Sequence, residues 1–251
     1  MISFEKMRFR YEPYPIGVAR PVMEEGRYAE YVKSFPPLEL FRHLPEFGNK
    51  YSLSEKYNPE NYEKFISSNP LWRDFHAWVK SEAFIDAVDA MLRRHHLDVG
   101  LDRHRQSSTV RARKALRHLM RGRLPCLPPR LRTRFEFSAL AADGGAVLPH
   151  TDTPRKIITL IVSMVLPGEW DPSHGGGTEV NRPKDVRWAY NWLNRQVPFE
   201  EVEELETFEF QPNQCVVFVK TFNSLHCVRP MTGKGSEAMR RTLTMNIELD
   251  E

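Results

Sequence analysis

The chain has 251 residues, enough for one large domain or two small ones, and one domain is the simpler expectation. Apolar residues make up 41% and charged residues 27%, which is ordinary for a globular protein and excludes a mostly disordered chain. There is no apolar run of about 18 residues and no apolar leader at the amino terminus, so we expect neither a membrane span nor a secreted precursor. Cys126, Cys215 and Cys227 are far apart, which predicts neither a disulfide framework nor a thiolate zinc site. We therefore expect a cytoplasmic protein.

The net charge of +3 hides an uneven distribution. Residues 93–134 contain thirteen Lys and Arg residues against only Asp98 and Asp102, a net charge of +11. Such a segment favours an anionic partner such as a phosphate, a carboxylate or a nucleic acid. A second interpretation is a solvated segment whose arginines pair with acidic residues elsewhere. No known nucleic-acid-binding motif accompanies the segment, so a nucleic-acid partner is not favoured.

The first 130 residues have an irregular pattern that then becomes helical. Within residues 71–96, apolar side chains recur at spacings of three to six, which predicts one or two amphipathic helices with a break near Ser81. A further helix is predicted over residues 110–120, before a boundary at Pro125, Pro128 and Pro129. We expect the helices of residues 71–96 to cover a sheet.

After this boundary the period of the pattern changes to two. The candidate strands are rich in Val, Ile, Thr and Phe and span residues 132–140, 147–152, 157–166, 177–181, 206–211, 214–220, 224–229 and 240–248. Short strands joined by turns such as Asp143-Gly144 fit one antiparallel, barrel-like sandwich. Residues 183–195 predict a short helix with Trp188 and Trp192 one turn apart, which either covers a substrate or packs against the barrel.

His150 and Asp152 form an H-x-D triplet on a predicted strand. Because alternate side chains of a strand share a face, both point the same way. His226, on a later strand, supplies a second imidazole. Two histidines and one carboxylate on one face of a metal ion, with the opposite positions open, are characteristic of non-haem Fe(II) oxygenases. The sequence therefore predicts an iron site.

An H-x-D triplet alone is a weak signal, and the chain has a second one at His96 and Asp98. This triplet ends a predicted helix, where residues two apart do not face each other, so we expect no metal there. The alternative for His150 and Asp152 is a surface ion pair beside a turn. For His226 it is a hydrogen-bonded histidine in the core.

Arg240 and Thr242 share one face of the last predicted strand. A guanidinium beside a hydroxyl can hold a carboxylate by charge-assisted hydrogen bonds, which predicts a site for the far end of a dicarboxylate. Arg241 is the alternative anchor, because the preceding loop at residues 233–239 leaves the assignment open. Arg240 is favoured, because it is two positions before Thr242 and so shares a face of the strand with it.

These features occur in an order that resembles the iron- and 2-oxoglutarate-dependent dioxygenases, and above all their prolyl 4-hydroxylase-like branch. The resemblance covers about residues 132–248, roughly half of the chain. Its motifs are residues 148–152, the glycines at 175–177, residues 223–230 and the Arg-x-Thr at 240–242. It implies a double-stranded β-helix, or jelly roll, with helices packed on its major sheet. In a single domain of residues 1–251, residues 1–130 would be helical support and residues 131–251 the catalytic core.

The resemblance also implies a set of site residues. His150, Asp152 and His226 would be the ligands of Fe(II), and Arg240 and Thr242 would bind 2-oxoglutarate, with O2 as the other co-substrate. Members of this branch often place a tyrosine upstream of the first histidine as a second contact of 2-oxoglutarate. The matching position here is Ala141, so another residue must serve; the candidates are Arg134, Glu136 and Ser138.

The expected function is hydroxylation of a polar or anionic metabolite or glycan, with release of succinate and CO2. A prolyl residue of a protein is the alternative substrate. An alternative of another class is a jelly roll that binds a metal or a ligand without catalysis, since a fold does not fix a function. A third is a nucleic-acid-binding module built on the basic segment. The oligomeric state is left open.

Overall fold

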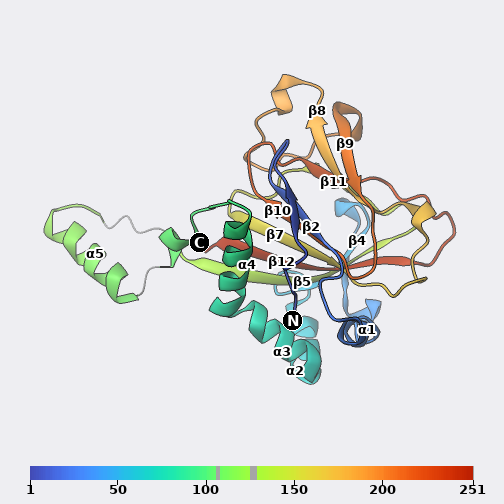
Figure 1. The fold of residues 1–251 in the computed structure, drawn as a ribbon, viewed down its shortest axis with the longest axis horizontal. Helices are drawn as coiled ribbons and strands as arrows, with labels where there is room; N and C mark the ends of the chain where they lie inside the picture. The colour runs from blue at the N-terminus through green and yellow to red at the C-terminus, as the bar shows by residue number, and fades with distance from the viewer. Residues whose placement is uncertain (106–107, 125–128, 251) are drawn as a thin grey trace.

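Two antiparallel β-sheets lie face to face, and helices pack against the outer face of the larger sheet (Figure 1). The computed structural model describes residues 1–105, 108–124 and 129–250. Cys126 and the predicted boundary at Pro125 and Pro128 lie outside these residues. Within them, none of the helices combines the length and the apolar character needed to cross a lipid bilayer.

The larger sheet has eight strands in the described part of the chain. In spatial order they are β1 (Arg8–Arg10), β2 (Ile16–Ala19), β10 (Cys215–Val219), β7 (Lys156–Ser163), β12 (Met239–Leu249), β5 (Leu131–Ala141), β4 (Lys50–Ser54) and β3 (Arg42–Leu44). The smaller sheet consists of β6 (Val147–His150), β11 (His226–Val228), β8 (Thr178–Pro183) and β9 (Val202–Phe208).

The strands from β5 onward follow the connectivity of a double-stranded β-helix. β5, β7, β10 and β12 lie in the larger sheet, and β6, β8, β9 and β11 lie in the smaller one. The long β12 pairs with β5 on one side and β7 on the other, so it forms the centre of the larger sheet. The jelly roll that the sequence predicted is confirmed.

Four helices cover the outer face of the larger sheet: α1 (Glu25–Lys33), α2 (Pro59–Ser68), α3 (Pro70–Val79) and α4 (Glu82–Arg94). The predicted break near Ser81 is confirmed, because α3 ends at Val79 and α4 begins after Ser81. A fifth helix, α5 (Ser108–Met120), fulfils the prediction for residues 110–120 and extends away from the sheets (Figure 1).

Alternation along β12 separates the two faces of the larger sheet. Leu243, Met245 and Ile247 are buried in the core shared with the helices. Arg240 and Thr242 are buried on the opposite face and line a cavity between the sheets. The period-two pattern thus places apolar groups under the helices and polar groups inside the jelly roll.

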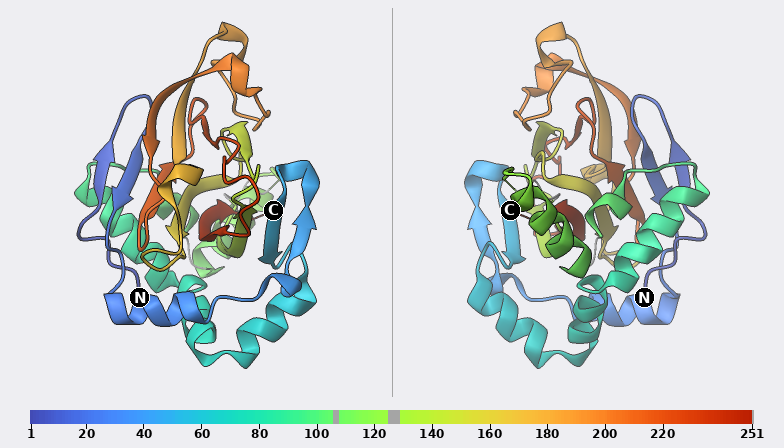
Figure 2. Two further views of the ribbon diagram at one scale, coloured as in Figure 1. Left: turned by 90° about the vertical axis from the view of Figure 1, so that its right-hand side faces the viewer. Right: turned by 90° about the vertical axis from the view of Figure 1, so that its left-hand side faces the viewer.

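Residues 1–130 contribute strands as well as the expected helices. β1 and β2 extend the larger sheet beyond β10, and β3 and β4 extend it beyond β5. Figure 2 shows these two blue pairs of strands, β1–β2 and β3–β4, on opposite sides of the molecule. The strands are three to five residues long, too short for a clear period of two. They form because neighbouring strands offer free hydrogen-bonding edges.

Residues 183–195 do not form the predicted helix that would place Trp188 and Trp192 one turn apart. Only Val186–Trp188 makes a single 3-10 turn. The side chain of Asn191 binds the backbone N–H and C=O of Arg195, at 2.8 and 2.6 Å. Such side-chain bonds to the backbone compete with helical ones and hold the segment in an irregular conformation.

We predict that Phe137→Ala lowers the free energy of unfolding by about 3–5 kcal/mol, as expected for a large side chain removed from a closed core. Phe137 is fully buried and contacts Trp72 edge-on, with ring centroids 4.7 Å apart. Chemical denaturation measures the change. Phe47→Ala is the matched control because the side chain of Phe47 is exposed, and equal losses for the two variants would contradict this description of the core.

Candidate metal centre

Three side chains that are distant in sequence converge between the two sheets. His226 on β11 lies directly across the sheet from His150 on β6, and the ring centroids are 4.4 Å apart. One ligand atom from each of His150, Asp152 and His226 lies within 4.8 Å of the others. The structure therefore brings together the three residues that the sequence singled out, in an arrangement that could hold a metal ion.

Both histidines are oriented by the backbone. The Nδ1 atom of His150 lies 2.9 Å from the carbonyl oxygen of Leu148, and that of His226 lies 2.9 Å from the carbonyl oxygen of Ser224. In the tautomer that donates Nδ1–H to these carbonyls, each Nε2 keeps its lone pair for a metal. The same local bond, from a histidine to the residue two positions earlier, fixes both rings.

Asp152 reaches the site by a turn instead of by strand alternation. β6 ends at His150, and Asp152 has a φ of +68°, in the left-handed region. The expected strand over residues 147–152 is thus too long, although the two side chains still converge. Asp and Asn tolerate this conformation better than most residues, which is a local reason for an aspartate here.

The carboxylate of Asp152 is fully bonded. Its Oδ1 accepts from Lys156 Nζ at 2.6 Å and its Oδ2 from Thr159 Oγ1 at 2.8 Å, while Asn246 donates to Thr159 Oγ1 at 2.8 Å. Burial alone would raise the pKa of Asp152, but Lys156 and His150 outweigh it and hold this pKa well below its usual range. The group is therefore a carboxylate at neutral pH, as a metal ligand must be.

His226 is buried and stacked on Phe218, with ring centroids 4.1 Å apart and an interplanar angle of 16°. Burial, followed by the neighbouring His150, lowers its pKa to about 3. The imidazole is thus neutral, and its free nitrogen is available as a ligand.

A cavity of about 120 Å³, here called the inner cavity, joins the three side chains to Arg240 and Thr242. Arg240 is buried, and its guanidinium lies 4.6 Å from the ring centroid of Phe210. Its Nε donates to the carbonyl oxygen of Gly176 at 2.5 Å. No carboxylate among the described residues pairs with it, and burial lowers its pKa to about 10. The guanidinium remains charged at neutral pH and faces a small enclosed space.

Arg241 lies on the other face of the strand. Its guanidinium pairs with Glu169 and lies 5.7 Å from the ring centroid of Phe35, under the helices. It does not line the inner cavity. Of the two arginines, only Arg240 shares a cavity with the histidines.

Gly176 explains part of the glycine triplet. A Cβ atom at this position, where φ is +79°, would lie 3.2 Å from Cδ of Arg240 and 3.0 Å from Trp170. A side chain would therefore crowd the arginine. Gly176 thus lets the backbone approach Arg240 closely.

The three candidates for a second co-substrate contact differ in their surroundings. Ser138 lines the inner cavity. Glu136 is buried and already pairs with Arg134 at 2.8 Å and Lys50 at 2.6 Å. Lys50 comes from the N-terminal strand β4 and also lines the inner cavity. Sequence reasoning missed it, because nothing in a five-residue strand indicates that it joins a distant sheet.

A wider pocket of about 530 Å³, here called the outer pocket, shares His150, Asp152 and Lys156 with the inner cavity. Basic side chains are prominent in its lining: Lys50, Lys56, Arg134 and Lys156. Its acidic lining residues are Glu46, Glu136 and Asp152. The outer pocket gives a molecule from solvent access to the metal centre.

Residues 183–195 contribute only partly to the surroundings of the site. Asn194 lines the outer pocket, whereas Asn191 is buried and bonded to the backbone. Tyr190 is exposed and stacks on Phe222, with ring centroids 5.3 Å apart. Trp188 and Trp192 line neither cavity. Of these side chains, Asn194 is therefore the one that lines the outer pocket.

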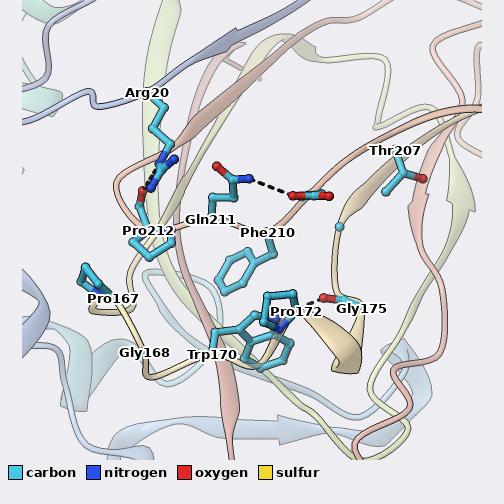
Figure 3. A pocket seen from close by; sticks show the side chains of 12 residues that line it. Arg20, Pro167, Gly168, Trp170, Pro172, Gly175, Thr207, Phe210, Gln211 and Pro212 are labelled. Atoms are coloured by element: carbon cyan, nitrogen blue, oxygen red, sulfur yellow. Dashed lines mark hydrogen bonds between the residues drawn. The ribbon is translucent and has the colours of Figure 1, made fainter.

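Another pocket of about 530 Å³ lies on the far side of Phe210 and shares no lining residue with the metal centre (Figure 3). Prolines and the aromatic rings of Trp170 and Phe210 form much of its wall. Arg20 donates to the carbonyl oxygen of Pro212 at 3.0 Å, and Gln211 donates to Glu209 at 2.8 Å. These polar groups are thus hydrogen-bonded within the wall of the pocket. The ring of Phe210, which forms part of this wall, contacts the guanidinium of Arg240.

No protein-family model matches the sequence, and a search of curated proteins finds no match. Solved structures do resemble the fold. A prolyl-4-hydroxylase from Pseudomonas putida is 10% identical, with a TM-score of 0.50 over 96% of this chain and 95% of that chain. A Trichoplax adhaerens prolyl hydroxylase, in complex with a peptide fragment of hypoxia inducible factor, is 13% identical, with a TM-score of 0.44 over 93% and 83%. SnoN, a non-heme alpha ketoglutarate dependent epimerase from nogalamycin biosynthesis, is 14% identical, with a TM-score of 0.47 over 95% and 78%.

The likeness in fold rests on the Pseudomonas putida structure, which spans nearly the whole of both chains. The resemblance predicted from the sequence is confirmed at this level. The chain has a jelly-roll fold with helices against the larger sheet, and it shares this fold with the prolyl-4-hydroxylase.

We predict that a divalent metal, tested as Mn(II) in place of the air-sensitive Fe(II), stabilises the protein. At a metal concentration 100 times Kd, binding to the native state adds about 2.7 kcal/mol to the free energy of unfolding. His226→Ala should remove this gain. His96→Ala, in the other H-x-D triplet, is the control and should keep it. Thermal unfolding with and without metal measures both, and an unchanged gain in His226→Ala would reject this site.

Proposed function

We propose that the protein is an Fe(II)- and 2-oxoglutarate-dependent oxygenase that hydroxylates its substrate. The observation that carries the proposal is the inner cavity, where a buried Arg240 without a carboxylate partner faces two histidines and a carboxylate. A buried charge is costly unless it is paired, so the guanidinium is suited to a ligand that brings its own carboxylate. A dicarboxylate with a metal-binding end fits both halves of the cavity.

The residues fit the cofactors by the chemistry of their donor atoms. His150, Asp152 and His226 would hold Fe(II), leaving the opposite coordination positions open. Arg240, with Thr242 beside it, would bind the distal carboxylate of 2-oxoglutarate. When bound, the iron supplies the reaction of O2 with 2-oxoglutarate that yields succinate and CO2 and hydroxylates a C–H group.

The surrounding side chains orient these groups. Thr159, held by Asn246, fixes Oδ2 of Asp152 and so directs Oδ1 toward the histidines. Phe218 holds the ring of His226 flat against the inner side of β10. For a second contact to 2-oxoglutarate we propose Ser138, which lines the inner cavity, in place of the tyrosine expected at Ala141.

We propose that the substrate is a polar or anionic metabolite or glycan. A divalent ion at the metal centre would repel the ammonium of Lys156, which lines both the inner cavity and the outer pocket. Lys56 lines the outer pocket and has no carboxylate partner among the described residues. Both ammonium groups are then available to a carboxylate or phosphate of the substrate.

A prolyl residue of a protein is the second candidate substrate. The fold likeness to a prolyl-4-hydroxylase favours it, although folds of this kind do not fix a substrate. A jelly roll that only binds a metal or ligand is the candidate of another class.

We also propose a single domain over residues 1–251, because β2 and β4 hydrogen-bond to strands of the jelly roll. The cytoplasmic location stays a prediction.

The proposed reaction is tested by incubating the protein with Fe(II), ascorbate, O2 and 2-oxoglutarate and measuring succinate. We expect slow succinate formation even without substrate, and its loss in Asp152→Ala. Arg240→Gln should weaken 2-oxoglutarate binding by about 2–5 kcal/mol, roughly 30-fold or more, and leave metal affinity unchanged. Arg241→Gln is the matched control. A folded, metal-loaded protein that forms no succinate would favour the purely binding function, and equal effects of the two arginines would reject the anchor.

The substrate class is tested by adding small organic acids, phosphate esters, their neutral analogues and prolyl peptides to the same assay. We expect the anionic compounds to stimulate succinate formation most. Lys56→Gln should raise their KM up to about fivefold, the range of an exposed ion pair, without changing the slow reaction in the absence of substrate. Lys64→Gln on α2 is the control. Stimulation by neutral compounds or prolyl peptides alone would overturn the anionic assignment.

A further inference from the structure

The basic segment divides into two parts with different surroundings. Arginines close to the body of the protein pair with acidic residues: Arg93 with Asp89 and Arg105 with Asp86. Arg113 and Arg117 of α5 differ, since no ion pair in the described residues involves either of them. The sequence offers α5 no nearby acid, because there is no Asp or Glu between residues 103 and 135. Arg113 and Arg117 therefore have no carboxylate partner among the described residues.

α5 has two chemically distinct faces. Ala112, Leu116, Leu119 and Met120 follow the i, i+4, i+7, i+8 spacing of one helical face. The basic residues Arg113, Lys114, Arg117 and Arg121 follow a similar spacing centred on the opposite face. The sequence thus builds an amphipathic basic helix.

The apolar face of α5 is exposed rather than packed against other described residues. Leu116 is 59%, Leu119 57% and Met120 80% exposed, and Leu124 just beyond the helix is 89% exposed. Figure 1 shows α5 extending from the body, away from the sheets and from α1–α3. An amphipathic helix normally covers its apolar face with the core of its own protein, which does not happen here.

We propose that α5 docks the protein on the surface of an anionic lipid bilayer. Helices with a basic face and a Leu- and Met-rich face lie in the plane of the membrane, with the apolar side chains at the boundary of the acyl chains. The arginines then lie level with the anionic head groups, each adding electrostatic attraction. A nucleic acid would use the basic face but leave Leu116, Leu119 and Met120 in water, so the two faces together favour a bilayer.

Docking by α5 would place the enzyme at a membrane without a spanning segment. It does not depend on the proposed oxygenase activity, because α5 lines neither the inner cavity nor the outer pocket. Membrane docking and oxygenase activity can therefore be tested independently of each other.

The test is sedimentation of the full-length protein with vesicles of pure phosphatidylcholine or of phosphatidylcholine mixed with phosphatidylserine. We expect binding to the mixed vesicles that weakens as salt is added. Leu116→Ser, Leu119→Ser and Met120→Ser combined, or Arg113→Glu, Arg117→Glu and Arg121→Glu combined, should each reduce binding at least about tenfold. The control for charge is Lys33→Glu, Arg42→Glu and Lys64→Glu combined, which should bind as the unchanged protein does.

Three results would overturn the proposal. The first is no binding of the unchanged protein to the mixed vesicles. The second is full binding by the serine variant together with competition by a single-stranded oligonucleotide, which would assign the basic face to nucleic acid. The third is a dimer, detected by light scattering, that only the serine variant loses; this would assign the apolar face to a second copy of the chain. Because the substituted side chains are exposed, the variants should unfold at the same temperature as the unchanged protein.

Discussion

The site is organised around the buried guanidinium of Arg240, which lines the inner cavity. A guanidinium buried between two sheets loses its hydration, and here the carbonyl of Gly176 and the face of Phe210 replace part of it. The jelly roll imposes this position, because the alternation along β12 directs every second side chain into the space between the sheets. A ligand that brings its own carboxylate would complete the pairing, and its other end would then lie on the side of the two histidines.

The three side chains of the candidate metal centre differ from Arg240, because hydrogen bonds within the protein already orient each of them. Backbone carbonyls fix the two imidazoles, and Lys156 and Thr159 hold the carboxylate of Asp152. Preorganised ligands lose little freedom on binding, which favours affinity. The inner cavity thus combines three preorganised side chains that could hold a metal ion with a buried, charged arginine, and the outer pocket lies beside them.

Much of this arrangement could be predicted from the sequence. The period of two along residues 240–248 separated Arg240 from Arg241, and the H-x-D triplet with His226 located the cluster. The local conformation was harder to predict: Asp152 converges with His150 through a left-handed turn, which strand alternation does not describe. Lys50 was missed because its short strand gains its structure from pairing with β5. The helix predicted from the spacing of Trp188 and Trp192 was wrong, because the side chain of Asn191 bonds to the backbone of Arg195 and holds the segment in an irregular conformation.

The decisive experiment is a crystal structure of the protein with Fe(II) and 2-oxoglutarate, grown without oxygen. We expect one iron bound by Nε2 of both histidines and one oxygen of Asp152, with the keto acid on the open side and its distal carboxylate on Arg240. Iron bound elsewhere, or a keto acid whose far carboxylate avoids Arg240, would contradict this expectation.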